Sequence, residues 1–349
     1  MRSLCLLFVL ATTLLSTACA AAPVTPIFVN VYPVTWTPEP TPTNTPRPPT
    51  ATLVIQHTPG PAPTRDPNLR RIPNAPRGGI GVWLDAANIK PALLTALVPR
   101  VQIIVEPVDA SNARPSGIFY FLKIDAAQGN ASELAARYDG VLIENATQEK
   151  VTTLRAKVAP RLVLVEPILE QANVLAARIP DADGICFCNF LREIDTPRAS
   201  FKIETDWKRD VDTLAALSSQ PNTIVLTATR FPDDATEKFA PTQQWLDYAA
   251  ASFLLGANTS YTFFGFQGKG AQEFLGAPAI AAQIGTPNGA MFKASGVYQR
   301  RFTRGLALVN PTNETRAFAL ARNYVTLNGT AITQLEMAPH SGMILLNVE

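Results

Sequence analysis

The chain has 349 residues, of which 47% are hydrophobic and 17% charged, which is enough for one large core with a small companion domain. Its formal net charge is only +2, and it contains no block of lysines or arginines. These features argue against nucleic acid or an anionic surface as a partner. Charge does not indicate a function further, so the function must be inferred from sequence motifs.

The first 18 residues have the pattern of a bacterial lipoprotein signal peptide. Arg2 is followed by the apolar stretch Leu4 to Leu15, which is too short to span a membrane comfortably, and small residues then lead to Cys19. Small residues before a cysteine resemble a lipobox, where cleavage leaves a lipidated cysteine as the first residue. We expect Cys19 to anchor the protein to the extracytoplasmic face of the cell membrane, or the protein to be secreted if Cys19 is not lipidated.

Residues 19–75 read as a stalk rich in proline and threonine. Twelve of the 30 prolines of the chain lie between Pro23 and Thr64. Proline at this density disfavours helices and central strands and favours an extended tether. The segment is therefore predicted to hold the folded part away from the membrane.

Residues 76–295 alternate strand patterns with helix patterns, which favours a parallel sheet. The expected fold is α/β, a (β/α)8 TIM barrel with a small C-terminal all-β domain, and a doubly wound open sheet is the alternative. Eight runs are predicted as strands: Gly79 to Leu84, Val101 to Val105, Ile118 to Ile124, Gly140 to Ile143, Leu162 to Val165, Gly184 to Cys188, Thr223 to Thr227 and Ser260 to Phe264.

Helical spacing of apolar residues predicts the segments that connect these strands. The stretch Pro107 to Gly117 is too polar and broken to form a convincing helix between the second and third strands. In the helix that begins at Asp206, Trp207, Val211 and Leu214 form an apolar stripe. The predicted helices are Ala87 to Leu97, Glu133 to Tyr138, Gln148 to Val158, Glu170 to Ala177, Asp206 to Leu217 and Gln243 to Leu255.

Residues 296–349 are predicted to form a small all-β domain. Short apolar runs (VYQRRF, LALV, AFALA, YVTL, ITQLEM and MILLNV) are separated by turn signals such as Asn328-Gly329. A domain of this size is close to the lower limit for independent stability, so we expect it to pack on the barrel.

Acidic residues end five consecutive predicted strands, although buried strands usually avoid acids. In a parallel barrel, the C-terminal ends of the strands meet in one ring, which is where such enzymes place their active sites. Any one of these acids alone is equally well explained as a helix cap or a member of an ion pair. The five are Asp85, Glu106, Asp125, Glu144 and Glu166.

Cys186 and Cys188 are the only cysteines in the predicted folded part. Side chains two residues apart on a strand share a face, which is a poor geometry for a mutual disulfide and supplies too few ligands for a metal site. We therefore interpret both as buried structural thiols.

Two predicted strands share an Asp-Gly pattern, Asp139 to Asn145 (DGVLIEN) and Asp183 to Asn189 (DGICFCN). Together with the segment Gly296 to Thr312 and the closing Pro339-His-Ser-Gly-Met-Ile-Leu, the first copy resembles hypothetical glycosyl hydrolase family 15. The resemblance covers most of residues 76–349. It implies a TIM barrel with a small β domain behind it and an acid at the mouth, Glu144 here, whereas the second copy has Cys188 at the matching place.

The chemistry implied is cleavage of a glycosidic bond by two carboxyl groups. Glu144 is assigned as the general acid, and the second carboxylate is left open among Asp85, Glu166 and Glu106. Carbohydrate is thus the expected partner, and a barrel that binds glycan without cutting it is the alternative, motivated by Cys188 and Asn189. The residues proposed to bind substrate are Trp83, Asp125, Asn145, Asn189 and Tyr261.

No cofactor and no metal are expected. The two histidines of the chain, His57 and His340, lie in the stalk and in the β domain, so the predicted barrel has neither a histidine-based metal cluster nor a Ser/His pair. The sequence makes no prediction of the oligomeric state.

Overall fold

A computed structural model describes residues 72–89, 91–107, 115–125, 137–167, 181–193, 196, 200–231, 242–268 and 271–348. These residues belong to one compact unit, residues 63–349. The predicted signal peptide, Cys19, most of the stalk, the helix predicted at Glu170 to Ala177 and nearly all of that predicted at Glu133 to Tyr138 lie outside the described residues. Among the described residues, no helix is both long and apolar enough to cross a membrane.

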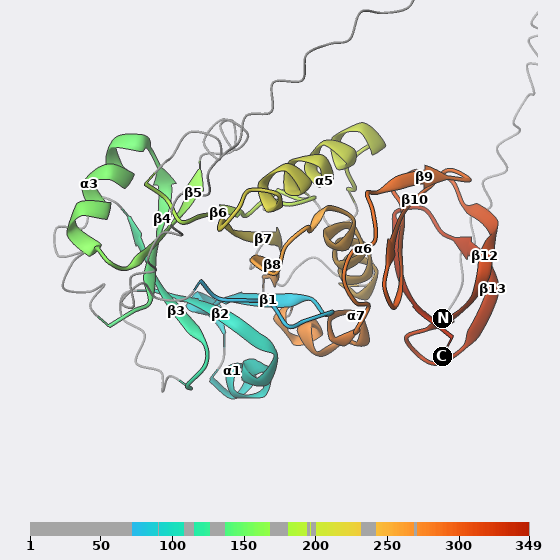
Figure 1. Ribbon diagram of the computed structural model, residues 1–349, viewed down its shortest axis with the longest axis horizontal. Helices are drawn as coiled ribbons and strands as arrows, with labels where there is room; N and C mark the ends of the chain where they lie inside the picture. Colours follow the sequence, from blue (N-terminus) through green and yellow to red (C-terminus); the bar gives the residue numbers. More distant parts are fainter. Residues whose placement is uncertain are drawn as a thin grey trace, which may run out of the picture. The chain divides into compact units, whose positions relative to one another are not determined.

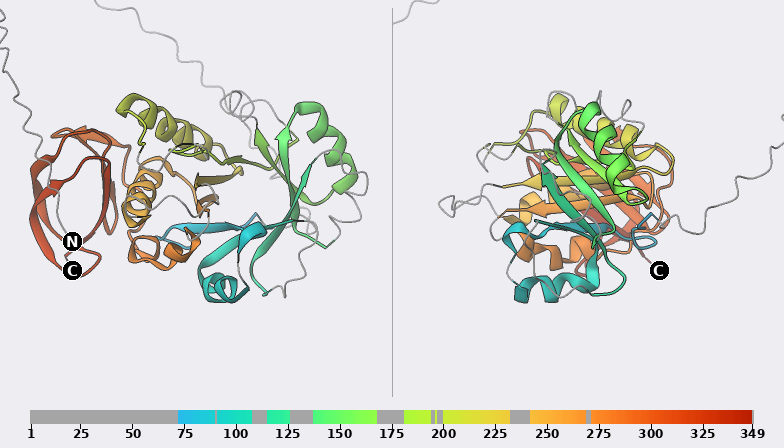
Figure 2. Two further views of the ribbon diagram at one scale, coloured as in Figure 1. Left: turned by 180° about the vertical axis from the view of Figure 1, so that it is seen from behind. Right: turned by 90° about the vertical axis from the view of Figure 1, so that its left-hand side faces the viewer.

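The described part of the chain contains a closed barrel of eight parallel strands, in which β1 pairs with both β2 and β8 (Figures 1 and 2). This confirms the predicted TIM barrel, and the ends of its strands differ from the predicted ends by at most three residues. The strands are β1 Gly81–Asp85, β2 Val101–Glu106, β3 Phe119–Asp125, β4 Gly140–Ala146, β5 Leu162–Pro167, β6 Gly184–Phe187, β7 Ile224–Arg230 and β8 Thr262–Gln267.

Helices connect the strands on the outside of the barrel (Figure 1). The helix α3 (Gln148–Val158) has the predicted bounds and begins after Thr147, whose hydroxyl accepts a hydrogen bond from the backbone N–H of Lys150. The predicted stripe of α5 is confirmed, because Trp207, Val211 and Leu214 are all buried. The remaining helices are η1 Ala86–Asn88, α1 Pro91–Leu97, η2 Val98–Arg100, α5 Glu204–Ser218, α6 Thr242–Gly256, η4 Gln272–Gly276 and α7 Pro278–Ala281.

The helix predicted at Ala87 to Leu97 is present as two short pieces, η1 and α1. Asp85 caps the first piece, since its Oδ1 accepts a hydrogen bond from the N–H of Ala87. Pro91 is the first residue of the second, a position that suits proline because the missing N–H has no partner in a first helical turn.

Side chains that alternate along the strands fill the interior of the barrel. Trp83, Phe121 and Phe263 belong to this inner cluster, which Ile72 and Ala75 also contact. Gly265 leaves room for the indole of Trp83, since a Cβ there would lie 2.7 Å from Trp83 Nε1. The interior is therefore packed, and a ligand can approach only from an end.

The two Asp-Gly glycines have a packing role at the starts of β4 and β6. A Cβ on Gly140 would meet the carbonyl oxygen of Leu162, and one on Gly184 would meet that of Ile224. The repeated Asp-Gly pattern thus reflects the close approach of neighbouring strands at the N-terminal end of the barrel. It is compatible with different residues at the C-terminal end, where the mouth lies.

A six-stranded antiparallel sheet follows the barrel in sequence (red in Figure 1). Two details differ from the prediction: the runs AFALA and YVTL belong to one long strand, β12, and β9 precedes the predicted boundary. The strands are β9 Phe292–Ala294, β10 Val297–Phe302, β11 Gly305–Asn310, β12 Arg316–Thr326, β13 Ala331–Met337 and β14 Ser341–Asn347, in the order β13-β12-β14-β11-β10-β9.

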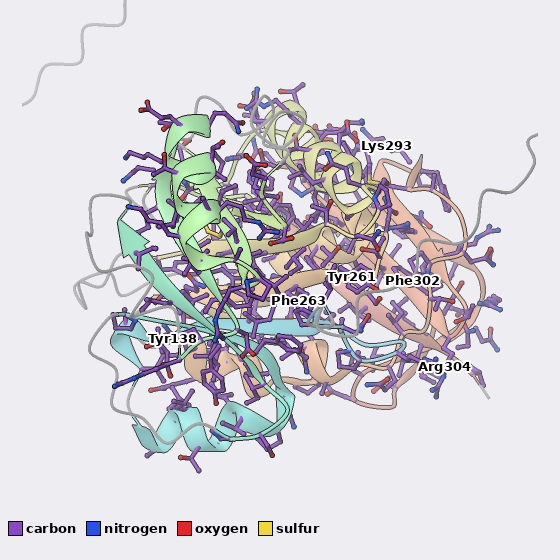
Figure 3. All side chains as sticks on the ribbon, turned by 60° about the vertical axis from the view of Figure 1, so that its left-hand side comes forward. Tyr138, Tyr261, Phe263, Lys293, Phe302 and Arg304 are labelled. Carbon is purple, nitrogen blue, oxygen red and sulfur yellow. A yellow bond between two sulfur atoms is a disulfide. The ribbon has the colours of Figure 1, made fainter. Side chains whose placement is uncertain are left out.

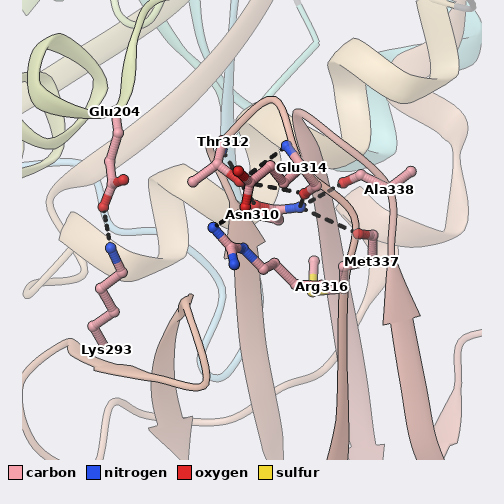
Figure 4. A network of polar contacts seen from close by, with 8 residues as sticks. All are labelled: Glu204, Lys293, Asn310, Thr312, Glu314, Arg316, Met337 and Ala338. Atoms are coloured by element: carbon pink, nitrogen blue, oxygen red, sulfur yellow. Dashed lines mark hydrogen bonds and ion pairs between the residues drawn. The ribbon is translucent and has the colours of Figure 1, made fainter. Parts of the chain in front are cut away.

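The sheet packs against α6 of the barrel through β10, β11 and β14. Gly342 permits the close approach, because a Cβ there would lie 2.7 Å from the Cα of Tyr248 on α6. Glu204 on α5 pairs with Lys293 of the sheet (Figure 4). It also accepts a hydrogen bond from the Tyr298 hydroxyl at 2.7 Å, so both residues tie the sheet to α5. The predicted packing of the β domain on the barrel is confirmed.

Asn310 organises the turn after β11 (Figure 4). It is fully buried, and its Nδ2 donates to the carbonyl oxygens of Glu314, Met337 and Ala338, while its Oδ1 accepts from the backbone N–H and the hydroxyl of Thr312. An aspartate here could not donate to three carbonyls. The Asn-Pro-Thr segment therefore serves the structure of the sheet.

Candidate active site

The five predicted acids lie at the C-terminal ends of five adjacent strands, β1 to β5. Their strands pair in register, with Asp125 opposite Glu144 and Asp85 opposite Val105. The side chain of Asp125 lies outside the described residues. The ring predicted from the sequence is therefore present in the backbone, and the side chains of the other four acids define its chemistry.

Lys123 joins two of these acids. Its Nζ lies 3.2 Å from Asp85 Oδ2 and 2.9 Å from Glu144 Oε1, although the three side chains come from β1, β3 and β4. Sequence reasoning missed this lysine, and the signal was a single charge inside the apolar run Phe119 to Asp125. A cation between two carboxylates offsets their mutual repulsion, so both can occupy the same small region.

The electrostatics of Lys123 reflect this arrangement. Burial alone lowers the pKa of its ammonium group, but attraction by Asp85, the hydrogen bond to Glu144 and the charges of Glu144 and Glu166 outweigh burial and raise the pKa. Lys123 is therefore a permanent cation at physiological pH.

Glu144 is the most accessible of these partners. Its side chain is 39% exposed, against 17% for Asp85. The register between β4 and β5 shifts between Ile143 and Ala146, and Asn145 has a φ of 47°, in the left-handed region. Such bulges bend a strand and re-aim its side chains, which here explains why Glu144 opens to solvent at the end of a buried strand.

Glu166 is held by Arg230 at the end of β7. Arg230 Nη1 lies 2.7 Å from Glu166 Oε1 and Nη2 lies 3.4 Å from Oε2, and both side chains are 16% exposed. Arg230 Nε also donates to Gln267 Oε1 on β8 at 3.3 Å. This bidentate contact fixes the orientation of Glu166 on the side of the mouth formed by β5, β7 and β8.

Two predicted site residues are completely buried. Glu106 at the end of β2 has no exposed surface, and Trp83 is equally buried, with its Nε1 donating to the carbonyl oxygen of Thr227 at 2.6 Å. In this conformation neither offers a surface to a ligand in the mouth. Trp83 belongs to the inner hydrophobic cluster of the barrel.

The other residues predicted to bind the substrate do not lie together in the structure. Asn145 is exposed beside Glu144, and Asn189 is partly exposed just after β6. Tyr261 precedes β8, and its carbonyl accepts a hydrogen bond from Val225 near the start of β7 (Figure 3). Because parallel strands have their starts at the end opposite the mouth, Tyr261 is not brought together with the acids.

Cys186 and Cys188 are buried as predicted, but they form a disulfide, so their interpretation as thiols is wrong. The physical reason is that β6 ends at Phe187 and the chain turns at Cys188. The Cα atoms lie 5.1 Å apart, which is closer than the roughly 6.6 Å that two residues of extended strand cover and well inside the range that a disulfide spans.

Glu166 lies next to this disulfide. One of its carboxylate oxygens and the sulfur atoms of Cys186 and Cys188 all lie within 4.8 Å of one another. The mouth thus combines an acidic pair around Lys123 with a group of one carboxylate, two sulfur atoms and the guanidinium of Arg230.

Comparison with solved structures finds barrels at very low sequence identity. A glycoside hydrolase family 5 protein from Bacteroides vulgatus is 9% identical with a TM-score of 0.44, covering 76% of this chain and 87% of its own. An alpha-amylase from Geobacillus thermoleovorans, solved with acarbose, is 9% identical with a TM-score of 0.45, covering 74% and 91%. An HpcH/HpaI aldolase from Desulfitobacterium hafniense is 10% identical with a TM-score of 0.34, covering 56% and 88%.

No curated protein sequence matches the chain significantly. A sequence profile does match, over residues 125–306, which include β4 to β8 of the barrel and the first two strands of the C-terminal sheet. The match spans more than half of the chain and contains Glu144, Glu166 and Arg230. The chain therefore belongs to hypothetical glycosyl hydrolase family 15.

Proposed function

We propose that the protein hydrolyses glycosidic bonds of an extracellular polysaccharide or oligosaccharide at the mouth of the barrel. The observation that carries the proposal is the contact of Asp85 and Glu144 with a single ammonium group, that of Lys123. Two carboxyl groups held close together at the C-terminal end of a TIM barrel are what glycosidic cleavage requires.

The spacing supports a mechanism that retains the anomeric configuration. Because Asp85 Oδ2 and Glu144 Oε1 contact the same nitrogen, they are at most about 6 Å apart. This upper bound lies below the roughly 6.5 to 9.5 Å between the carboxyl groups of inverting enzymes, and it includes the roughly 5 to 5.5 Å of retaining ones.

The roles of the two acids follow from their exposure and contacts. Glu144, the more exposed, enters the reaction in its protonated form and gives this proton to the departing glycosidic oxygen as Asp85 attacks the anomeric carbon and the C–O bond breaks. Glu144 then takes a proton from water, whose oxygen attacks the same carbon and releases Asp85. Asp85 suits the nucleophile because Ala87 N–H and Lys123 hold its two oxygens in place.

Glu166 is the weaker candidate for the second carboxylate, because it contacts Arg230, whereas Asp85 and Glu144 contact the same lysine. Glycan binding without cleavage is the alternative function. It is favoured by the observation that Asp85, Glu144 and Glu166 each contact a basic side chain, which suits a polar binding surface as well as a reactive one.

The test is a glycan panel in which bound sugar and released sugar are both measured for the purified chain. We expect release by the wild type, and retained binding with loss of release in Glu144→Gln. Glu149→Gln, an exposed glutamate on α3, is the matched control and should release sugar normally. Release that survives in Glu144→Gln would exclude Glu144, while binding without any release by the wild type would favour the alternative.

We also propose that the protein is lipid-anchored through Cys19 on the extracytoplasmic face of the cell membrane. The sequence before Cys19 supports this, and so does the Cys186–Cys188 disulfide, because disulfides persist mainly in oxidising compartments. Replacing Cys19 with alanine should move the protein from the membrane fraction to the soluble fraction. A Cys19→Ala protein that stays with the membrane would exclude the anchor.

A further inference from the structure

Cys186, Cys188 and Glu166 have the composition of a metal site. The two cysteines supply only two sulfur atoms, but the pairing of β5 with β6 adds a third donor, because Glu166 lies near the C-terminal end of β5. The three donor atoms lie within 4.8 Å of one another. The three donors are therefore already close together in the observed conformation.

The three donors differ in how far they are buried. Cys186 and Cys188 are 1% and 4% exposed and belong to the inner core of the barrel, while the Glu166 side chain is 16% exposed. The two sulfur atoms are thus fixed by packing, and the carboxylate lies on the side that faces the mouth. A small cation can reach such a group, whereas a protein thiol partner would have little access.

The disulfide contributes little to fold stability. A disulfide stabilises mainly by restricting the unfolded chain, and the effect grows with the length of the loop it closes. Cys186 and Cys188 are separated by only two positions, so this bridge closes almost the shortest loop available. Stability alone therefore gives little reason for a cysteine pair inside a barrel that is already well packed.

We propose that the reduced chain binds Zn²⁺ through Cys186, Cys188 and Glu166. A thiol or phosphine reductant supplies two electrons and two protons to convert the disulfide into two thiols, and metal binding then releases both protons. Two thiolates and one carboxylate suit Zn²⁺, and three protein ligands leave a fourth position for water. Oxidation to the disulfide removes both thiolates and abolishes the site.

The neighbouring charges match this assignment. Two thiolates, one carboxylate and one Zn²⁺ leave a single negative charge, and the guanidinium of Arg230, 2.7 Å from Glu166, compensates it. Arg230 also orients the carboxylate, which is the usual role of a group that hydrogen-bonds to a metal ligand. Zinc binding is independent of the proposed glycosidase activity, because none of its three ligands is Asp85 or Glu144.

The test measures metal binding directly. The full chain, reduced with a phosphine or left oxidised, is titrated with Zn²⁺ against a chromophoric indicator, and Co²⁺ is added separately to record the thiolate-to-metal absorption band. We expect one equivalent of tight binding and a thiolate band in the reduced chain, and at least about 100-fold weaker binding in the oxidised chain.

Variants separate the site from other thiols. The double variant Cys186→Ser/Cys188→Ser keeps Cys5 and Cys19 and should lose the binding and the band, while Glu166→Gln should bind about 10 to 100-fold more weakly and keep the band. Glu149→Gln is the control and should bind as the wild type does. Unchanged binding in the double variant, unchanged affinity in Glu166→Gln, or no binding by the reduced wild type would each overturn the proposal.

Discussion

Replacement of Asp85 by asparagine should reduce the rate of sugar release by at least about 10³-fold, because the amide cannot attack the anomeric carbon. The substitution keeps the shape of the side chain and one oxygen, which can still accept from Ala87 N–H, while the amide NH2 replaces the oxygen that contacts Lys123. Because the shape is kept, binding should change much less than turnover. The measurement is initial-rate kinetics on whichever glycan the chain cleaves, with binding recorded in parallel.

Glu144→Gln tests the other role in the same mechanism, that of the general acid and base. With a natural leaving group, the loss of the general acid should cost about 10² to 10⁴-fold. An aryl glycoside with a good leaving group needs no proton for the first step, but the second step still lacks its base. A covalent glycosyl-enzyme should then accumulate, and peptide mass spectrometry should locate the sugar on Asp85.

Asp212→Asn is the matched control for Asp85→Asn. Asp212 is a half-exposed aspartate on α5 that pairs with Lys208, at a distance from the acids of the mouth in the chain and in the fold. Its replacement should leave turnover unchanged. Normal turnover in Asp85→Asn, or a sugar attached to Glu166 in the trapped protein, would show that the second carboxylate was assigned wrongly.

The positions of the acids could be predicted from the sequence because they depend on local patterns. A buried strand of a parallel barrel reads as a short apolar run, and its last residue lies at the mouth whatever the rest of the chain does. Asp85, Glu144 and Glu166 therefore appear where the pattern places them. The antiparallel strands after β9 were also predictable, since turn residues separate them.

The partners of the acids could not be predicted, because they depend on contacts across the mouth. Lys123 lies on β3 and reaches Asp85 on β1, two strands away, and Arg230 on β7 reaches Glu166 on β5. Each pair of strands flanks a common neighbour, β2 or β6, so these contacts depend on the order and curvature of the strands in the barrel. The spacing of residues along the sequence does not predict these contacts. The one available signal is a lysine within an apolar run, which is unusual enough to identify Lys123 as a candidate.

Two errors have a common cause in the ends of strands. Tyr261 was assigned to the mouth, yet β8 begins after it, and the start of a parallel strand lies at the far end of the barrel. Cys188 was placed on a straight strand, yet β6 ends one residue earlier, so the chain can bend enough for a disulfide. One residue at a strand end changes which chemistry is possible.

Arg300 on β10 is the second residue whose loss should have a large effect, and here the effect is on stability. It is 4% exposed, and its Nη1 donates to the carbonyl oxygens of Leu254, Leu255 and Ala257 at 3.1, 3.1 and 2.8 Å. Leu254 and Leu255 belong to the last turn of α6, where carbonyls have no partner within the helix, and Ala257 is the residue that follows the helix. Arg300 thus caps the helix against which the C-terminal sheet packs, and its charge suits the negative end of the helix dipole.

Arg300→Leu should lower the free energy of unfolding by about 3 to 5 kcal/mol, because a buried side chain that serves several carbonyls is replaced by one with no donor. Arg301→Leu, on the same strand but exposed, is the matched control and should cost less than about 1 kcal/mol. Arg300→Lys should fall between them, since one ammonium cannot reproduce the planar fork of donors. Urea unfolding measures all three, and equal midpoints for Arg300→Leu and Arg301→Leu would show that the helix end of α6 does not depend on the sheet.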